Sequence, residues 1–294
     1  MCKTKADNRW IQFVCFTAVI TLSLPLHAQQ TQPDRQSDKN GEAEIFSGPQ
    51  PGEKLPPLKV RIVIGDYAGK VKDIIADTTG KTVFLVFMNE FGELENEMMR
   101  TITLYAEQLS NPNVVTAVVW LTPDPSDMET KLNRSGRYMP HKTPVGISLA
   151  GPEGPGAYGL NRNVKMTIVV AKDNVVTASI ALIQPSIASD SLPAVRELVK
   201  VIGGKLPTYE EVVSPREQQF VAMRLERLLD KSTSDDLFKR MSRGLESYAR
   251  SRPAAKSKLG QLASEYVQSD QYEDRKVAIG YLRKWAKEYG MTEE

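Results

Sequence analysis

A cluster of polar and acidic residues follows directly after the most apolar run of the chain. The run covers residues 82–88, and Asn89, Glu90, Glu93 and Glu95 come after it. An amide and several carboxylates at one turn would suit the rim of a polar ligand site, or would hold a cation. Acidic residues at the start of a helix also interact favourably with the helix dipole, so the same residues are typical of an ordinary helix start. Both interpretations stay open from the sequence.

A buried strand and a helix would position these residues. Residues 82–88 are rich in Val and Phe, which predicts a strand buried on both faces. Residues 96–109 carry one apolar stripe, which predicts an amphipathic helix. The stripe consists of Met98, Ile102, Tyr105 and Leu109. In open α/β sheets, ligands bind where a strand ends and a helix begins.

The rest of the N-terminal two thirds also indicates an α/β fold. Strands are expected at 58–64, 114–121, 145–149, 169–172 and 175–182, and helices at 126–135 and 192–201. A strand, a helix and a second strand in one apolar sheet imply a right-handed parallel crossover. Asp173 and Asn174 are typical residues for the turn of a hairpin.

Residues 154–159 spell the pattern G-x-G-x-x-G, and Asp173 follows the next strand. This pattern marks dinucleotide sites when a helix follows it. Only residues 160–166 separate the last glycine from the next strand, which is too short for a parallel crossover with a helix. We therefore expect a loop that leads into an antiparallel strand, and no nucleotide site.

Three segments resemble the thioredoxin fold, in the variety used by peroxiredoxins and thiol-disulfide reductase domains. Residues 52–57 look like the opening segment of that family, and residues 80–87 look like its first central strand. Residues 158–170, which hold Tyr-Gly-Leu-Asn and a later apolar run, look like its late turn and hairpin strand. The resemblance covers roughly residues 52–204 and implies a mixed sheet flanked by helices.

The chain departs from this family at its reactive centre. The family's Cys-x-x-Cys would fall at residues 92–95 and its cis-proline near 164–166, and neither cysteine nor proline is there. Thiol-disulfide exchange needs a thiolate. The resemblance implies that two segments would form any remaining binding surface, with no catalytic residue among them. Their residues are Asn89, Glu90, Phe91, Gly92, Val164, Lys165 and Met166.

The start of the chain resembles a secretory signal. Residues 1–28 have a positive beginning, an apolar core and Leu-His-Ala before the expected cleavage site. The alternative is a membrane anchor, for which the apolar stretch is short. An export signal predicts a periplasmic or extracellular protein.

Signal removal would leave a mature chain without cysteine. The sequence holds two cysteines, Cys2 and Cys15, and both lie in the signal. His27 would leave as well, so His141 would be the only histidine. We therefore expect no zinc site built from Cys and His, and no metal or other cofactor. His141 could act as a lone acid or base, or lie in an ordinary surface loop.

Composition divides the chain into several parts. Residues 29–50 are polar and read as a disordered linker, and residues 51–204 as the thioredoxin-like domain. Residues 205–213 are predicted to be a second linker, with a small all-α domain at 214–294. Its first helix would start at the capping box Ser214-Pro215-Arg216-Glu217.

Charge argues against some partners. The net charge of the whole chain is +2, and the signal alone carries Lys3, Lys5, Arg9 and Asp7, so the mature chain is close to neutral. Nucleic acid or an anionic membrane held by bulk charge is therefore not expected.

Three functions remain compatible with the sequence. The favoured one is a binding module for an exported protein or peptide, without redox chemistry. The second is an enzyme with non-thiol chemistry that uses Glu90 or Glu93 and Lys165, or an oxidoreductase relative of unknown activity. The third is a structural envelope protein in which the helical tail is the active part. At the strand-end turn we expect a neutral, peptide-like ligand, because the helix N-terminus favours a carbonyl group while Glu90 and Glu93 repel an anion.

Overall fold

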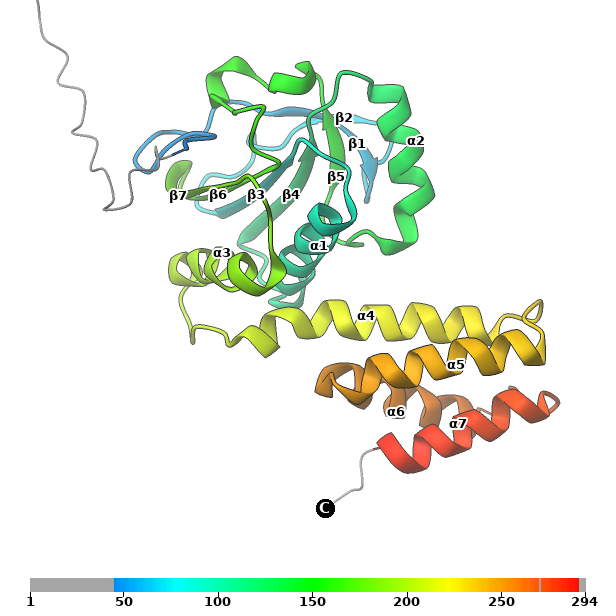
Figure 1. Cartoon of the computed structure of the whole chain (residues 1–294). Coiled ribbons are helices and arrows are strands. Elements are labelled where there is room, and N and C mark those ends of the chain that lie inside the picture. Colours follow the sequence, from blue (N-terminus) through cyan, green and yellow to red (C-terminus); the bar gives the residue numbers. More distant parts are fainter. Residues whose placement is uncertain (1–44, 270, 291–294) are drawn as a thin grey trace, which may run out of the picture. The chain divides into compact units, whose positions relative to one another are not determined.

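The computed structural model describes residues 45–269 and 271–290, so the expected signal and most of the first linker lie outside it. One sheet of seven strands forms its centre, in the order β2-β1-β5-β4-β3-β6-β7 (Figure 1). The strands are β1 (Lys59–Ile64), β2 (Val71–Asp73), β3 (Thr82–Met88), β4 (Val114–Trp120), β5 (Val145–Ser148), β6 (Met166–Lys172) and β7 (Val175–Leu182).

Helices flank the sheet and make up the last third of the chain. They are α1 (Glu93–Gln108), α2 (Pro125–Ser135), α3 (Ile187–Ile202), α4 (Tyr209–Leu229), α5 (Asp235–Arg250), α6 (Pro253–Gln268) and α7 (Lys276–Tyr289). Three short 3-10 helices are η1 (Gly136–Tyr138), η2 (Gly151–Glu153) and η3 (Gly156–Tyr158). The predicted α/β class, a mixed sheet flanked by helices followed by an all-α region, is confirmed.

Strand β3 lies near the middle of the sheet, and all its residues are buried. It pairs in parallel with β4 and antiparallel with β6, and β5 continues the parallel part. The hairpin between β6 and β7 turns at Asp173 and Asn174, whose φ angles of 52° and 64° fit a tight turn of this kind. Because β6 runs antiparallel to β3, the glycine-rich segment before it is a loop and not a nucleotide-binding crossover, as predicted.

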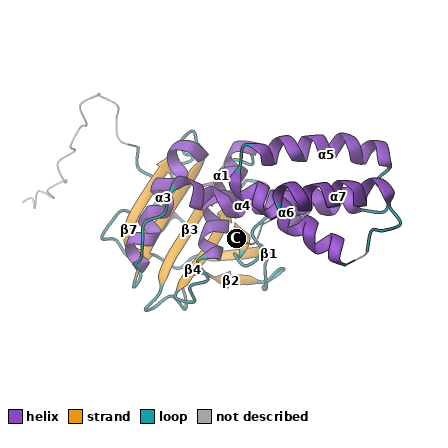
Figure 2. Cartoon of the chain, turned by 90° about the horizontal axis from the view of Figure 1, so that it is seen from below, coloured by secondary structure: helices purple, strands orange, loops and turns teal. Residues whose placement is uncertain are grey.

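Two apolar cores lie on the two faces of the sheet. Successive side chains of β3 alternate between them, as the geometry of a strand requires: Phe84 and Val86 enter one core, Leu85 and Phe87 the other. Helices α1, α2 and α3 contribute to the first core, and Figure 2 shows α1 and α3 beside the sheet. The second core is closed by residues outside the α-helices, among them Leu55 and Ile75 in loops and Tyr158 of η3.

The ordered fold begins before residue 51. Ser47 is buried, and its hydroxyl lies 2.6 Å from the hydroxyl of Thr167 on β6. The backbone N–H of Gly48 donates to the carbonyl of Gly159. The last residues of the predicted linker 29–50 therefore pack on the sheet. They are held there by hydrogen bonds to Thr167 of β6 and to the carbonyl of Gly159.

The predicted start of the first tail helix is wrong. Helix α4 begins at Tyr209, and its capping box is formed by Thr208 and Glu211. Pro215 lies inside this helix. The helix therefore includes residues 209–213, which the sequence analysis assigned to a linker. The reason is tertiary packing, because Val212 on the first turn of α4 is fully buried in the core of the sheet.

Helix α4 belongs to two cores. Its first turns pack against α1, while Val221, Leu225 and Leu228 enter a third core that the helices α4–α7 share. Phe238 and Trp285 are the largest buried side chains of this third core. Among the described residues, no helix combines the length and the apolar character needed to cross a membrane.

Candidate functional site

The two segments predicted to form the site lie side by side. The backbone N–H of Asn89 donates to the carbonyl of Lys165 at 2.9 Å, and the Asn89 amide donates to the carbonyl of Val164 at 2.6 Å. This contact follows from the sheet, because Met88 at the end of β3 is paired with Met166 at the start of β6. The expectation that both segments share one end of the sheet is confirmed.

Lys165 is the centre of a small ionic cluster at this end. Its Nζ lies 2.9 Å from Glu90 Oε2 and 3.0 Å from Glu95 Oε1. The Glu95 side chain is 7% exposed, whereas that of Glu90 is 51% exposed. The hydrogen bonds to Glu90 and then to Glu95 raise the pKa of Lys165. The lysine therefore carries its positive charge at neutral pH.

Gly92 gives Glu95 the room to reach this lysine. Gly92 is the N-cap of α1 and has no side chain to bond the first turn. A Cβ atom at this position would collide with the Glu95 carboxylate. The absence of a side chain at residue 92 thus lets Glu95 fold back over the helix start.

The apolar residues of the turn have two different roles. Phe91 packs against Trp120 of β4, with 5.0 Å between the ring centroids, and anchors the turn to the core. Leu94 is 68% exposed, although it is a large apolar side chain. Ile183, directly after β7, is 43% exposed. Since Leu182 is paired with Met166, Ile183 lies at the same end of the sheet as Lys165.

Glu95 was named among the acidic residues of the turn, but not among the expected binding residues. Only the enzyme alternative combined Lys165 with Glu90 or Glu93. The structure brings Lys165 to Glu90 and Glu95. A sequence signal existed, because Glu95 is the third residue of α1 and a glutamate there turns back towards the N-cap.

The chemistry available at this turn is that of ion pairs and hydrogen bonds. One ammonium group and two carboxylates face one another, and much of their hydrogen-bonding capacity is used within the cluster. In the described part of the chain, no group of three or more His, Cys, Asp or Glu side chains is arranged to hold a metal ion. Parts of Glu90, Lys165 and Leu94 are exposed to solvent.

His141 lies elsewhere, in the loop before β5. It lines a cavity of about 660 Å³ together with residues of η1, α4 and the start of α5. This cavity has no sequence signal, because its residues come from segments far apart in the chain.

Comparison with known proteins gives matches among solved structures only. No family model matches the sequence, and no curated protein matches it.

The solved structures that are similar include thiol-disulfide proteins and a peroxidoxin. One is a candidate thiol:disulfide interchange protein DsbE from Chlorobium tepidum, with 17% identity, 52% of this chain and 99% of that chain covered, and a TM-score of 0.41. Another is peroxidoxin BcpB from Mycobacterium tuberculosis, with 14% identity and a TM-score of 0.39. The match covers 52% of this chain and 97% of that chain. A DsbF homologue from Corynebacterium diphtheriae shows 16% identity and a TM-score of 0.36. The match covers 56% of this chain and 95% of that chain.

The topology itself has the features that the sequence resemblance implied. A buried central strand leads into a helix, a parallel crossover follows, and an antiparallel hairpin and a closing helix complete the sheet. By the order and direction of its elements, residues 45–202 form a thioredoxin-like fold.

Proposed function

We propose that this protein is an exported, thioredoxin-like binding module without redox chemistry. It holds an extended segment of a protein or peptide partner at the end of β3, where β6 begins. The single observation that carries the proposal is the position of Lys165. Its ammonium group binds Glu90 and Glu95 at the turn where the resemblance places the family's cysteines and cis-proline.

Redox activity has no chemical basis in the folded part of the chain. The sequence contains no cysteine after Cys15. Disulfide exchange and peroxide reduction by this family's chemistry require a thiolate nucleophile. The mature protein therefore neither reduces disulfides nor consumes peroxide by a thiol mechanism.

The ion pairs also argue against a lysine-based enzyme at the same place. A lysine that acts as nucleophile or general base has a lowered pKa, so that part of it is neutral. The hydrogen bonds from Lys165 to Glu90 and Glu95 raise its pKa instead. This lysine is suited to hold a shape and to donate a hydrogen bond, and not to attack a substrate.

The exposed groups fit a peptide. Lys165 donates hydrogen bonds and the half-exposed carboxylate of Glu90 accepts them, which matches the alternating donors and acceptors of an extended backbone. Leu94 and Ile183 supply exposed apolar surface at the same end of the sheet. Two carboxylates against one ammonium group disfavour an anionic ligand, so a neutral segment fits best.

Export is part of the proposal. The positive start, apolar core and Leu-His-Ala sequence within residues 1–28 support it. The mature chain would then act in the periplasm or outside the cell. Fractionation of cells that produce the full chain, with N-terminal sequencing of the product, tests this part separately.

Site-directed photo-crosslinking tests the binding function. A photo-reactive amino acid at position 94 of the mature protein should crosslink a defined partner from the native exported fraction, which mass spectrometry then identifies. The double variant Glu90→Ala, Leu94→Ser should lose binding to that purified partner by at least tenfold. The control variant Leu206→Ser, which alters an exposed leucine outside the site, should bind as the unmodified protein does.

Two results would overturn the proposal. One is equal binding of the purified partner by the site variant and the unmodified protein. The other is reduction of insulin disulfides by a clean preparation, surviving thiol alkylation, which would show redox chemistry that the sequence does not provide for.

A further inference from the structure

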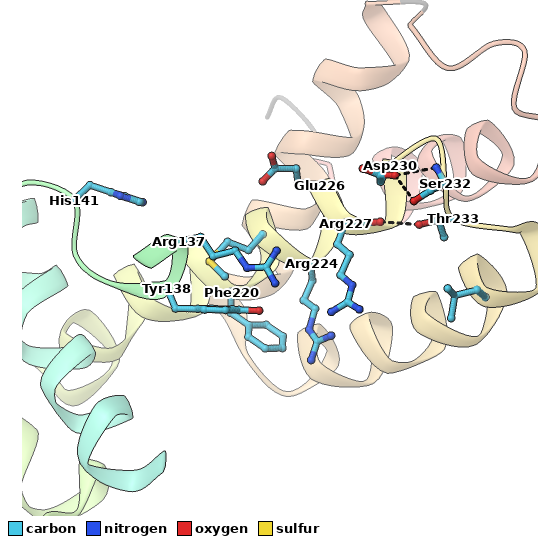
Figure 3. Close-up of a pocket in the computed structure, with 12 residues that line it drawn as sticks. Arg137, Tyr138, His141, Phe220, Arg224, Glu226, Arg227, Asp230, Ser232 and Thr233 are labelled. Carbon is cyan, nitrogen blue, oxygen red and sulfur yellow. Dashed lines mark hydrogen bonds between the residues drawn. The ribbon is translucent and has the colours of Figure 1, made fainter. Parts of the chain in front are cut away.

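A cavity separate from the strand-end turn carries three arginines. It has a volume of about 660 Å³ and is lined by η1, the loop after it, α4 and the first residues of α5. Figure 3 shows Arg137, Arg224 and Arg227 extending their guanidinium groups into the same region. A volume of this size is typical of sites for small organic molecules.

Within the part of the chain that the structure describes, these guanidinium groups form no ion pairs. In residues 45–269 and 271–290, the arginines that form ion pairs are Arg61, Arg100, Arg162, Arg216, Arg252 and Arg283. Arg224 and Arg227 lie one helical turn apart on α4, and Arg137 joins them from a segment distant in sequence. Arginines gathered without acidic partners repel one another, and an anion removes this repulsion.

Neither carboxylate in the cavity lining, Glu226 or Asp230, forms an ion pair among the described residues. Asp230 accepts hydrogen bonds from the backbone N–H and the hydroxyl of Ser232, and these bonds lower its pKa and hold it in the turn after α4. Glu226 points away from Arg224 and Arg227 in Figure 3. Three guanidinium groups and two carboxylates line the cavity, so the region into which the guanidinium groups extend carries the excess positive charge.

Aromatic and apolar side chains adjoin the positive groups. Arg224 lies over the ring of Phe220 at 5.2 Å, and Arg137 over the ring of Tyr138 at 4.9 Å. Phe220 and Arg224 also line a second, more apolar hollow of about 260 Å³, together with Leu228, Met241, Leu245 and Tyr248. The cationic cavity thus continues into an apolar one across Phe220.

We propose that these two hollows form one binding site for a small organic anion with an apolar or aromatic body. The anionic group, a phosphate or a carboxylate, is held by Arg137, Arg224 and Arg227. Guanidinium groups bind both kinds of anion with paired hydrogen bonds. The body of the ligand lies against Phe220 and enters the hollow beside Met241.

A matched set of three probes tests the two halves of the site. 1-Naphthyl phosphate carries the anion and the ring, inorganic phosphate carries the anion alone, and 1-naphthol carries the ring alone. Calorimetric titration of the mature protein should show naphthyl phosphate binding at least tenfold more tightly than either of the others. This affinity should fall as the salt concentration rises, because the arginines are exposed to solvent.

Two charge-matched variants distinguish a built site from bulk charge. Arg137→Gln with Arg227→Gln changes two arginines that line the first hollow but not the second. This variant should weaken naphthyl phosphate binding at least tenfold and leave naphthol binding unchanged. Arg240→Gln with Arg243→Gln removes two exposed arginines of α5 that line neither hollow and should leave both affinities unchanged. Far-UV circular dichroism checks that both variants are folded.

Several outcomes would overturn the site. Equal affinity for naphthyl phosphate and inorganic phosphate would show that the apolar hollow does not contribute to binding. An equal loss of naphthyl phosphate affinity in both double variants would show that net charge alone causes the binding. The variant Glu90→Ala, Leu94→Ser should bind naphthyl phosphate normally, so failure of this site and failure of the strand-end site are separate results.

Discussion

Lys165, directly before β6, binds the buried carboxylate of Glu95 on α1, with 3.0 Å between Nζ and Oε1. The two residues are far apart in sequence, and their contact ties the helix to the hairpin at the end of the sheet. Because Glu95 is 7% exposed, its carboxylate depends on this lysine for a charged partner. The ion pair therefore contributes to the geometry of the proposed binding surface.

Replacement of this lysine should destabilise the fold. Lys165→Met leaves the Glu95 carboxylate buried without its cation, and we expect the free energy of unfolding to fall. Urea denaturation measures the change. Adding Glu95→Gln should restore part of the loss, since the double variant no longer buries an unpaired charge. Lys59→Met, which changes an exposed lysine of β1, serves as the control. Equal losses in the two lysine variants would contradict a structural role for the ion pair.

A second ionic contact joins the sheet to the helical tail. Glu97 on α1 binds Arg100 on the same helix and Arg216 on α4, and Arg100 also donates to Gln219 of α4 at 2.8 Å. The Arg100 side chain is only 7% exposed, so little water reaches this contact, and burial lowers the pKa of the guanidinium group. Glu97 is therefore the acidic partner of two arginines at the joint.

Glu97→Gln should loosen the joint without unfolding either core. We expect a loss of about 1–3 kcal/mol in the free energy of unfolding, because two arginines lose their carboxylate. Hydrogen exchange should quicken in the first turns of α4, and much less in α7. Unchanged exchange in α4 would show that apolar packing alone holds the two parts together.

The sequence predicted most of the sheet and less of the contacts across it. Residues 82–88 form β3 as expected, because a run that is apolar on both faces favours a buried strand. The start of α4 was missed because two capping signals, at Thr208 and at Ser214, lie six residues apart and look alike locally. Packing of Val212 in the core selects the first signal.

The candidate sites, like the fold, could be predicted from the sequence only in part. The resemblance placed Asn89 and Lys165 at one end of the sheet, and the strand pairing confirms it. It did not show that Lys165 contacts Glu95, since the direction of a side chain depends on the room that Gly92 leaves. The arginine cavity gave no sequence signal, because Arg137 and Arg224 meet only through the packing of α4 on the first domain.

The helical tail should lose stability in acid through Glu246. Burial opposes the charge of this carboxylate, but hydrogen bonds from Lys284 and from the Trp285 indole, both 2.8 Å, outweigh it and lower its pKa. A lowered pKa stabilises the fold above the ordinary carboxyl value, and the stabilisation disappears as the pH falls through the folded value. We expect Glu246→Gln to cost about 1 kcal/mol at pH 7. The cost should shrink below about pH 4, and denaturation curves at both pH values measure it. A cost that stays constant with pH would show that hydrogen bonding, and not charge, is the source of the effect.

Limited proteolysis tests where the two parts of the chain separate. Gly203 and Gly204 have positive φ angles, and Lys205 and Leu206 are exposed before α4 begins at Tyr209. Trypsin should therefore cut after Lys205 before it cuts after Arg216, which lies inside the helix and binds Glu97.

The fragments produced by that cut should stay together. Val212 lies in the core of the sheet and α4 packs along α1, so the tail keeps its apolar contacts after the chain is cut. Size-exclusion chromatography without denaturant should show both fragments in one peak, and Glu97→Gln should make them separate more readily. A first cut after Arg216 would contradict the rigid start of α4. Immediate separation of the fragments would instead restore residues 205–213 as a true linker between two independent domains.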